Sequence, residues 1–350
     1  MSRLILTWTA LLLAVPAFGA DRTDNKTTAR EASTSEAQAI HAEMIAFGQW
    51  MIRLDAATTE AIAAFRDVGP SWNAAMATGS PDAMEARFRP TLARVEAAIG
   101  TARARLDALD TPSFPRLRLP VDTEPVRLRA EMQRMIGNMA DIAQTLPGVM
   151  TAMRARDPSA TRLAMVKMLD TTRALFRAQA ALTAAWAATT EADDPTLQSL
   201  RFELLFFKSG VRLLDSVERG ALGKPDPTLG ADLRGIAGEI DAVVTAGNKL
   251  VDAQRAEFTA SREELAGEKD PESVSARAMA DKVVAMSGLQ QEGFAVSQRY
   301  AAQLRRTADA AGSGPVSMTV LGPMIDSLRT TRTELDEIGM RVAQVMAGTK

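Results

Sequence analysis

The sequence predicts an all-α protein of about eight antiparallel helices, which form either one elongated bundle or two related four-helix units. Composition is the first reason, because alanine is abundant, aromatic residues make up only 5% of the chain, and β-branched runs are nearly absent. The second reason is the stretch 197–217, which has the apolar spacing of a packed helix. The third is a series of prolines that are typical of helix starts.

The stretch 197–217 is the segment around which we expect the fold to be organised. One apolar seam follows spacings of three and four residues, and a second stripe lies beside it, so about half of the helix surface should be covered. The seam consists of Leu197, Leu200, Leu204, Phe207, Val211 and Leu214, and the second stripe of Phe202, Phe206, Leu213 and Val217. This pattern predicts a core helix and indicates no activity.

The first 20 residues have the organisation of a secretory signal peptide. Arg3 is followed by the apolar stretch 4–15, and small residues precede the polar Asp21. An uncleaved anchor is the alternative, but the apolar stretch is shorter than the roughly 18–20 residues of a membrane span. Residues 21–34 lack apolar periodicity and predict a disordered leader. We therefore expect a periplasmic or secreted chain with no transmembrane span after cleavage of the signal.

Prolines preceded by a capping side chain mark most of the expected helix starts, since proline suits the first helical turn. The pairs are Ser80–Pro81, Asp157–Pro158, Asp194–Pro195, Asp226–Pro227 and Asp270–Pro271, and Gly314–Pro315 is a sixth start without a cap. The expected helices span 35–67, 81–110, 122–155, 158–190, 195–222, 227–267, 271–311 and 316–347.

Some of these helices have features of their own. Pro147 and Pro323 fall inside two of them and should kink or break each helix. The helices 227–267 and 271–311 would each be about 60 Å long and would form an elongated antiparallel hairpin. The proline-rich stretch 111–125 predicts irregular backbone, which serves either as a plain connector or as a partner-binding segment.

The helices also suggest an internal duplication. Residues 86–109 align with 231–254, and Met168 to Arg173 resemble Met324 to Arg329. The two alignments differ in offset, and alanine-rich helices resemble one another by chance. If the duplication is real, the chain consists of an N-terminal helical unit, 35–191, and a C-terminal helical unit, 192–350.

Charge is distributed unevenly along a chain whose formal net charge is only -2. Residues 21–86 carry 5 basic and 10 acidic side chains, residues 87–177 carry 16 and 9, and residues 178–350 carry 19 and 24. A nearly neutral total predicts no general affinity for nucleic acid. The basic middle segment either packs beside the acidic flanks or presents a face to an anionic partner.

Arginines in this basic middle segment are the candidate contacts for such a partner, because guanidinium groups pair bidentately with carboxylate or phosphate. The candidates are Arg116, Arg118, Arg127, Arg129 and Arg134. The partner would be a protein, a component of the cell envelope or a small anionic ligand. Reversing several of these charges should then weaken binding in a salt-dependent way.

The sequence contains few of the residues that catalysis and metal binding need. It has no cysteine, one histidine and one tyrosine. This excludes a cysteine nucleophile, cysteine-based zinc sites and a two-histidine metal site within one chain. Phosphate-binding, dinucleotide-binding and nucleophile-elbow motifs are also absent from the sequence. We therefore expect no enzyme activity, no metal and no cofactor.

Methionines are the one residue type that suggests a metal. Met132, Met135 and Met139 share a helix face, and thioether clusters can bind copper(I). The same spacing is typical of core positions, which methionine often fills, and we favour that interpretation.

The function that the sequence favours is therefore binding without catalysis. We expect an exported helical-bundle protein that binds a protein, an envelope component or a small anionic ligand. The alternative is a structural or chaperone-like envelope stress protein, which would show an exposed apolar concavity.

Overall fold

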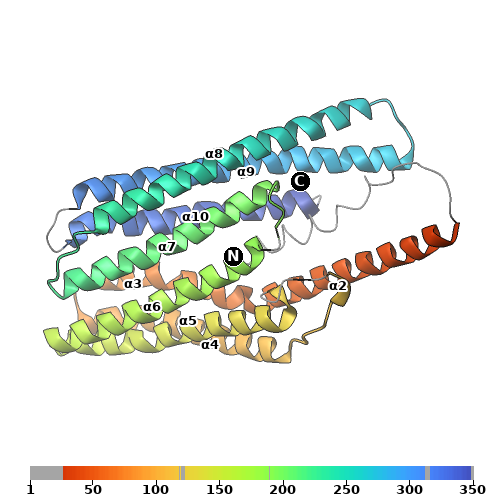
Figure 1. The fold of residues 1–350 in the computed structure, drawn as a ribbon. Helices are drawn as coiled ribbons and strands as arrows, with labels where there is room; N and C mark the ends of the chain where they lie inside the picture. Colours follow the sequence, from red (N-terminus) through yellow and green to blue (C-terminus); the bar gives the residue numbers. More distant parts are fainter. Residues whose placement is uncertain (1–26, 118, 120–122, 189, 312–315, 348–350) are drawn as a thin grey trace.

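The computed structural model describes residues 27–117, 119, 123–188, 190–311 and 316–347. Within this part of the chain there is no strand, so the all-α prediction is confirmed. The described residues form eight long helices, which run along a common direction in an elongated bundle (Figure 1). Their bounds are α2 (Thr27–Arg66), α4 (Pro81–Ala108), α5 (Pro125–Arg154), α6 (Pro158–Ala187), α7 (Pro195–Ala221), α8 (Leu229–Glu264), α9 (Pro271–Ala310) and α10 (Met318–Ala347), with short α3 (Val68–Met76) and the 3-10 turn η1 (Pro115–Leu117) between long helices.

The prolines mark helix starts as predicted in four cases: α4, α6, α7 and α9 each begin at the expected proline. Asp157, Asp194 and Asp270 each accept a hydrogen bond from a backbone N–H of the first turn, at 2.7–3.0 Å. These carboxylates satisfy N–H groups that have no partner inside the helix. The capping residues therefore fix where three of the long helices begin.

Other helix starts differ from the prediction. α2 begins at Thr27, so residues 27–34 of the predicted leader belong to this helix, and the run from Ala29 to Ala32 consists of good helix formers. α8 begins two residues after Pro227, because Asp226 pairs with Arg212 instead of capping the helix. α5 begins three residues and α10 two residues later than expected. The predicted signal peptide, 1–20, and residues 21–26 lie outside the described residues.

The internal prolines do not break their helices. α5 continues through Pro147 and α10 through Pro323, and α4 also contains a proline, Pro90. An internal proline removes one backbone hydrogen bond and strains the turn before it. Each of these helices packs against long neighbours, and this packing maintains the helix across the proline.

The long helices pack as two groups of four. α2, α4, α5 and α6 form the N-terminal group, and α7, α8, α9 and α10 form the C-terminal group. α6 packs against α7, and one continuous apolar core extends through both groups. In the described residues, no helix is both long enough and apolar enough to cross a membrane.

α7 lies at the centre of the bundle and contacts α6, α8, α9 and α10 (Figure 1). Gly210 allows close contact with α6, because a Cβ there would lie 2.4 Å from the ring of Phe176. On another side, the buried hydroxyls of Ser209 and Tyr300 share a hydrogen bond of 2.5 Å. Burial on several sides confirms that the stretch 197–217 is a core helix.

The two groups repeat the same packing pattern in α4 and α8. The predicted alignment superimposes the second long helix of one group on the second long helix of the other. Positions that align are buried in both helices. The pairs are Met84 and Leu229, Phe88 and Leu233, Val95 and Ile240, Ile99 and Val244, Ala102 and Gly247, and Leu106 and Val251.

The repeat extends to α5 and α9, the third long helices. Asp107 accepts a hydrogen bond from Gln133 at 2.7 Å, and Asp252, which aligns with Asp107, accepts one from Gln291, also at 2.7 Å. Aligning the two glutamines brings further buried positions together. These pairs are Leu128 and Met286, Ile136 and Phe294, Met139 and Ser297, Ile142 and Tyr300, Ala143 and Ala301, and Leu146 and Leu304. Matching contacts between helices support the duplication more strongly than similarity of alanine-rich sequences.

Candidate functional site

The predicted arginine face is largely used for contacts within the chain. Arg116 donates to Glu43 on α2 through its backbone N–H and its side chain, at 2.9 and 2.8 Å. Arg129 donates to the carbonyl oxygen of Leu109 at 2.6 Å.

The remaining candidates are Arg118, Arg127 and Arg134. Arg134 pairs with Glu131 one turn away on α5, and Arg127 is exposed near the start of that helix. Arg118 lies outside the described residues. Binding of an anionic partner at these arginines therefore stays a prediction.

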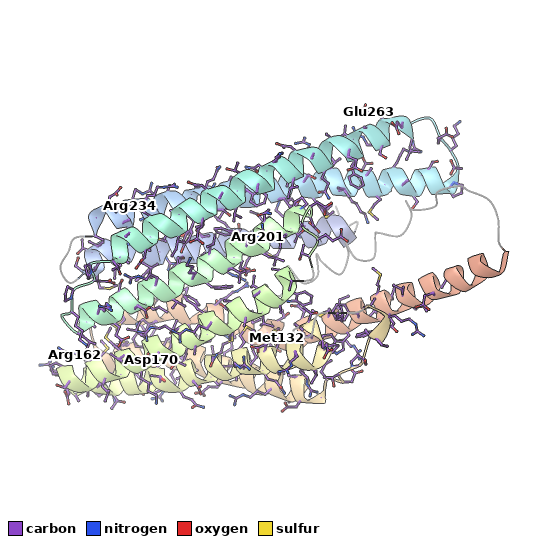
Figure 2. The ribbon with its side chains drawn as sticks, in the orientation of Figure 1. Met132, Arg162, Asp170, Arg201, Arg234 and Glu263 are labelled. Carbon is purple, nitrogen blue, oxygen red and sulfur yellow. The ribbon has the colours of Figure 1, made fainter. Side chains whose placement is uncertain are left out.

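The methionines of α5 are core residues. Met132, Met135 and Met139 are each at most 2% exposed and belong to the main apolar core; Figure 2 labels Met132 on α5. Among the described residues, no group of three or more histidine, aspartate or glutamate side chains is arranged to hold a metal ion.

The best candidate site is an apolar cavity in the C-terminal group, between α7, α9 and α10, which we call the α7–α9–α10 pocket. Its volume is about 100 Å³, several times the space that one water molecule needs. It lies where the main core meets a smaller apolar cluster formed by Val283, Met286 and Leu289 of α9 and Val342 of α10. The apolar side chains that line it are Phe202, Met286, Leu289, Phe294, Leu335, Ile338 and Val342.

A charged network forms the polar wall of the pocket. The carboxylate of Glu203, which is almost completely buried, accepts a hydrogen bond from Arg332 at 2.8 Å. Arg332 also pairs with Asp336 at 3.2 Å, and Asp336 pairs with Arg66 of α2 at 2.8 Å. Burial alone would lower the pKa of Arg332, but the two carboxylates outweigh burial and raise it. Each acidic side chain of the wall is thus paired with an arginine.

Gln290 contributes a polar atom with no partner. Its Oε1 is buried and accepts no hydrogen bond from the described part of the chain, and the residue lines the pocket. A buried acceptor without a donor costs about 1–3 kcal/mol. An unsatisfied group of this kind on the wall of a cavity favours a ligand that can donate to it.

Small residues on α9 explain why the pocket is open. A Cβ built on Gly293 would meet no atom within 4 Å, and the neighbouring turn of the helix contributes Ser297. In the N-terminal group the aligned positions are Met135 and Met139, which fill the core. Methionine has four side-chain heavy atoms where glycine has none and serine has two. The pocket is therefore a difference between two otherwise similar helices.

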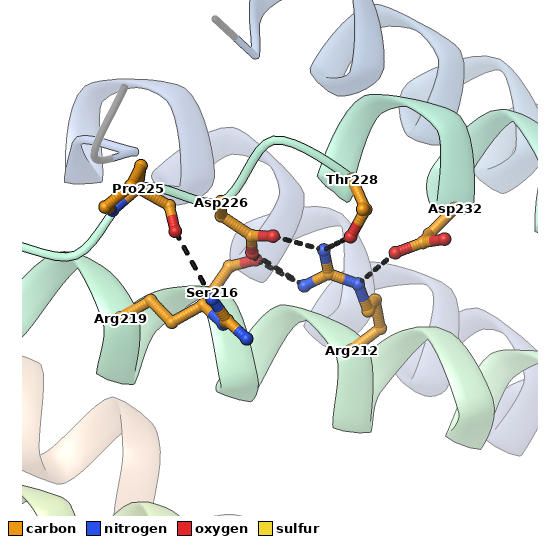
Figure 3. A network of polar contacts seen from close by, with 7 residues as sticks. All are labelled: Arg212, Ser216, Arg219, Pro225, Asp226, Thr228 and Asp232. Carbon is orange, nitrogen blue, oxygen red and sulfur yellow. Dashed lines mark hydrogen bonds and ion pairs between the residues drawn. The ribbon is translucent and has the colours of Figure 1, made fainter. Parts of the chain in front are cut away.

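A second polar cluster lies at the other end of α7, where the chain turns into α8 (Figure 3). Arg212 pairs bidentately with the buried carboxylate of Asp226 at 2.6 and 2.7 Å and also with Asp232 at 2.7 Å. Ser216 donates to Asp226 as well. Because these groups satisfy one another, this cluster holds the α7–α8 connection in place and is a poor candidate for a ligand site.

Comparison with known proteins identifies no relative. No family model, no curated protein and no solved structure matches this chain. Function therefore has to be inferred from the geometry of the chain itself.

Proposed function

We propose that this chain is a non-catalytic binding protein that holds a small apolar ligand in the α7–α9–α10 pocket. The observation that carries the proposal is the gap in the packing beside Gly293, in a helix whose counterpart is filled by methionines. Interiors normally pack to the density of organic crystals, with few voids larger than a water molecule. An apolar cavity with a few polar groups is the usual form of a ligand site.

The chemistry of the lining favours binding over reaction. Glu203 and Asp336 are the acidic lining residues, and both are held in ion pairs with Arg332. Both carboxylates are thus engaged by the guanidinium group, which leaves them poorly placed to contact a substrate. Among the described residues, the lining includes no histidine, lysine or tyrosine that would act as a nucleophile or general base.

A fluorescent probe tests this proposal. N-phenyl-1-naphthylamine is uncharged and becomes bright in apolar surroundings, so we expect saturable binding to the full mature chain. The combined change Gly293→Met and Ser297→Met, which introduces the residues of α5, should fill the pocket. The affinity for the probe should then fall by at least about tenfold, equivalent to ~1.4 kcal/mol.

Two further variants control this experiment. Gly235→Met is the matched control, because Gly235 is an exposed glycine of α8 where an added side chain also meets no atom. It should leave the affinity for the probe unchanged. Gly293→Leu is a smaller filling for use if the double variant loses helicity. Equal probe binding by the wild type and the folded filled variants would overturn the proposal and favour the structural or chaperone-like alternative.

A further inference from the structure

We infer that the α7–α9–α10 pocket selects an uncharged ligand that carries a hydrogen-bond donor on an apolar body, such as a medium-chain alcohol or amide. The inference rests on the proposed function, since it describes the ligand of the same pocket. Two features of the pocket support this inference: the charge balance of its polar wall and the buried side-chain oxygen of Gln290 that accepts no hydrogen bond from the described residues.

The charge balance argues against an ionised ligand. Glu203 and Asp336 are matched by Arg332 and Arg66, at distances of 2.8–3.2 Å, so the wall has no excess charge to offer. An anion or cation entering this pocket would lose its hydration and find no unpaired counter-charge. The pocket thus differs in preference from the arginine-rich segment, whose predicted ligand is anionic.

Gln290 argues for a donor on the ligand. Its Oε1 is buried at the pocket wall and has no hydrogen-bond partner among the residues that the structure describes. An O–H or N–H group of a ligand would satisfy this oxygen, whereas a ligand that can only accept would leave it unpaired. The polar end of the ligand is therefore expected beside α9.

The position of the N-terminal group that aligns with Gln290 carries no hydrogen-bonding side chain. There the residue is Met132, which is 1% exposed and packs in the core. Glutamine and methionine side chains have similar length and volume, so packing alone does not require an amide at position 290. The polar side chain thus lies beside the pocket on α9, whereas the aligned, filled position of α5 carries an apolar side chain.

Three probes of equal chain length separate the features of the ligand. 1-Octanol is uncharged and can donate, its methyl ether is uncharged and cannot donate, and octanoate is an anion at pH 7. Each is titrated calorimetrically into the full mature chain. We expect 1-octanol to bind about 3- to 10-fold more tightly than the ether, which corresponds to one net hydrogen bond. Octanoate should bind at least about 10-fold more weakly than 1-octanol.

The variant Gln290→Met identifies the residue responsible. It should bring the affinities for 1-octanol and the ether together, while the ether itself binds as well as before. Gln298→Met, on an exposed part of α9, is the matched control and should keep the wild-type preference.

The possible failures are distinguishable. If no probe binds the wild type, the proposed function is wrong, and this inference falls with it. If 1-octanol and the ether bind equally, or if octanoate binds best, the pocket is a ligand site but the inference about its ligand is wrong. If the preference for 1-octanol survives in Gln290→Met, the donor is recognised elsewhere and the role of Gln290 is refuted.

Discussion

The contact between Gly247 and Phe294 provides a demanding test of the repeated packing. A Cβ on Gly247 would lie 2.2 Å from Cζ of the buried Phe294 ring, whereas ordinary contacts lie at 3.4–4 Å. The ring would therefore have to move by more than 1 Å in a packed core. Overpacking of this kind lowers the free energy of unfolding by about 1–3 kcal/mol. Alanine has a better helix propensity than glycine, which offsets up to about 1 kcal/mol of this loss. A displacement of more than 1 Å places the overpacking cost in the upper part of its range, about 2–3 kcal/mol, so Gly247→Ala should destabilise the protein by a net ~1–2 kcal/mol.

The other group indicates how to relieve this clash. The aligned pair is Ala102 and Ile136, so Phe294→Ile should make room for alanine at position 247. Phe294→Ile alone should also be destabilising, because it removes buried apolar atoms. The double variant should be more stable than the sum of the single effects by about 1 kcal/mol or more, the coupling expected between residues in contact.

Urea unfolding of the wild type, both single variants and the double variant measures this coupling. Thermal melts provide a check, because about 1 kcal/mol shifts the melting temperature of a domain of this size by about 2–4 °C. A neutral Gly247→Ala variant would show that the α8–α9 contact is looser than the structure indicates. Strictly additive effects would refute the equivalence of the two helix pairs.

Three further predictions concern polar groups in the C-terminal group. Asp226→Asn should cost about 3 kcal/mol in urea unfolding, because it leaves Arg212 without its most buried partner. The hydrogen bond from Arg212 holds the pKa of Asp226 below its ordinary value of 3.8. The Arg212–Asp226 ion pair therefore stabilises the protein fully above about pH 4. This stabilisation is lost as the pH falls through the lower pKa that Asp226 has in the folded protein. Acid titration of Asp226→Asn should not show this loss. Tyr300→Phe should cost about 1 kcal/mol, since it removes the buried hydrogen bond with Ser209; an unchanged urea midpoint would contradict this.

Much of the fold could be predicted from the sequence because its signals are local. A capping aspartate followed by proline fixes a helix start whatever the rest of the chain does, as at Asp157, Asp194 and Asp270. The same signal was misleading at Asp226, because a distant arginine competes for the carboxylate. Local patterns do not reveal that competition, since Arg212 lies on the preceding helix.

The candidate site could not be predicted in this way. Gly293 and Ser297 are ordinary helical residues in the sequence, and a cavity appears only when the residues opposite them fail to fill the space. The alignment of α5 with α9 would have exposed the change from methionine to small residues. This alignment is difficult to detect in the sequence, because the offset in numbering changes between one pair of helices and the next. The offset changes because α8 and α9 have 36 and 40 residues, whereas α4 and α5 have 28 and 30.

The most direct test of the pocket is to locate a bound ligand by NMR of methionine methyl groups. Met286 lines the pocket, whereas Met132, Met135 and Met139 fill the corresponding region of the N-terminal group. In protein labelled with ¹³C at the methionine methyls, titration with 1-octanol should shift the Met286 signal and produce contacts between its methyl group and the octyl chain. The three α5 signals should stay in place. Shifts confined to the α5 methionines, or no shift of Met286 at saturating 1-octanol, would contradict a ligand site between α7, α9 and α10.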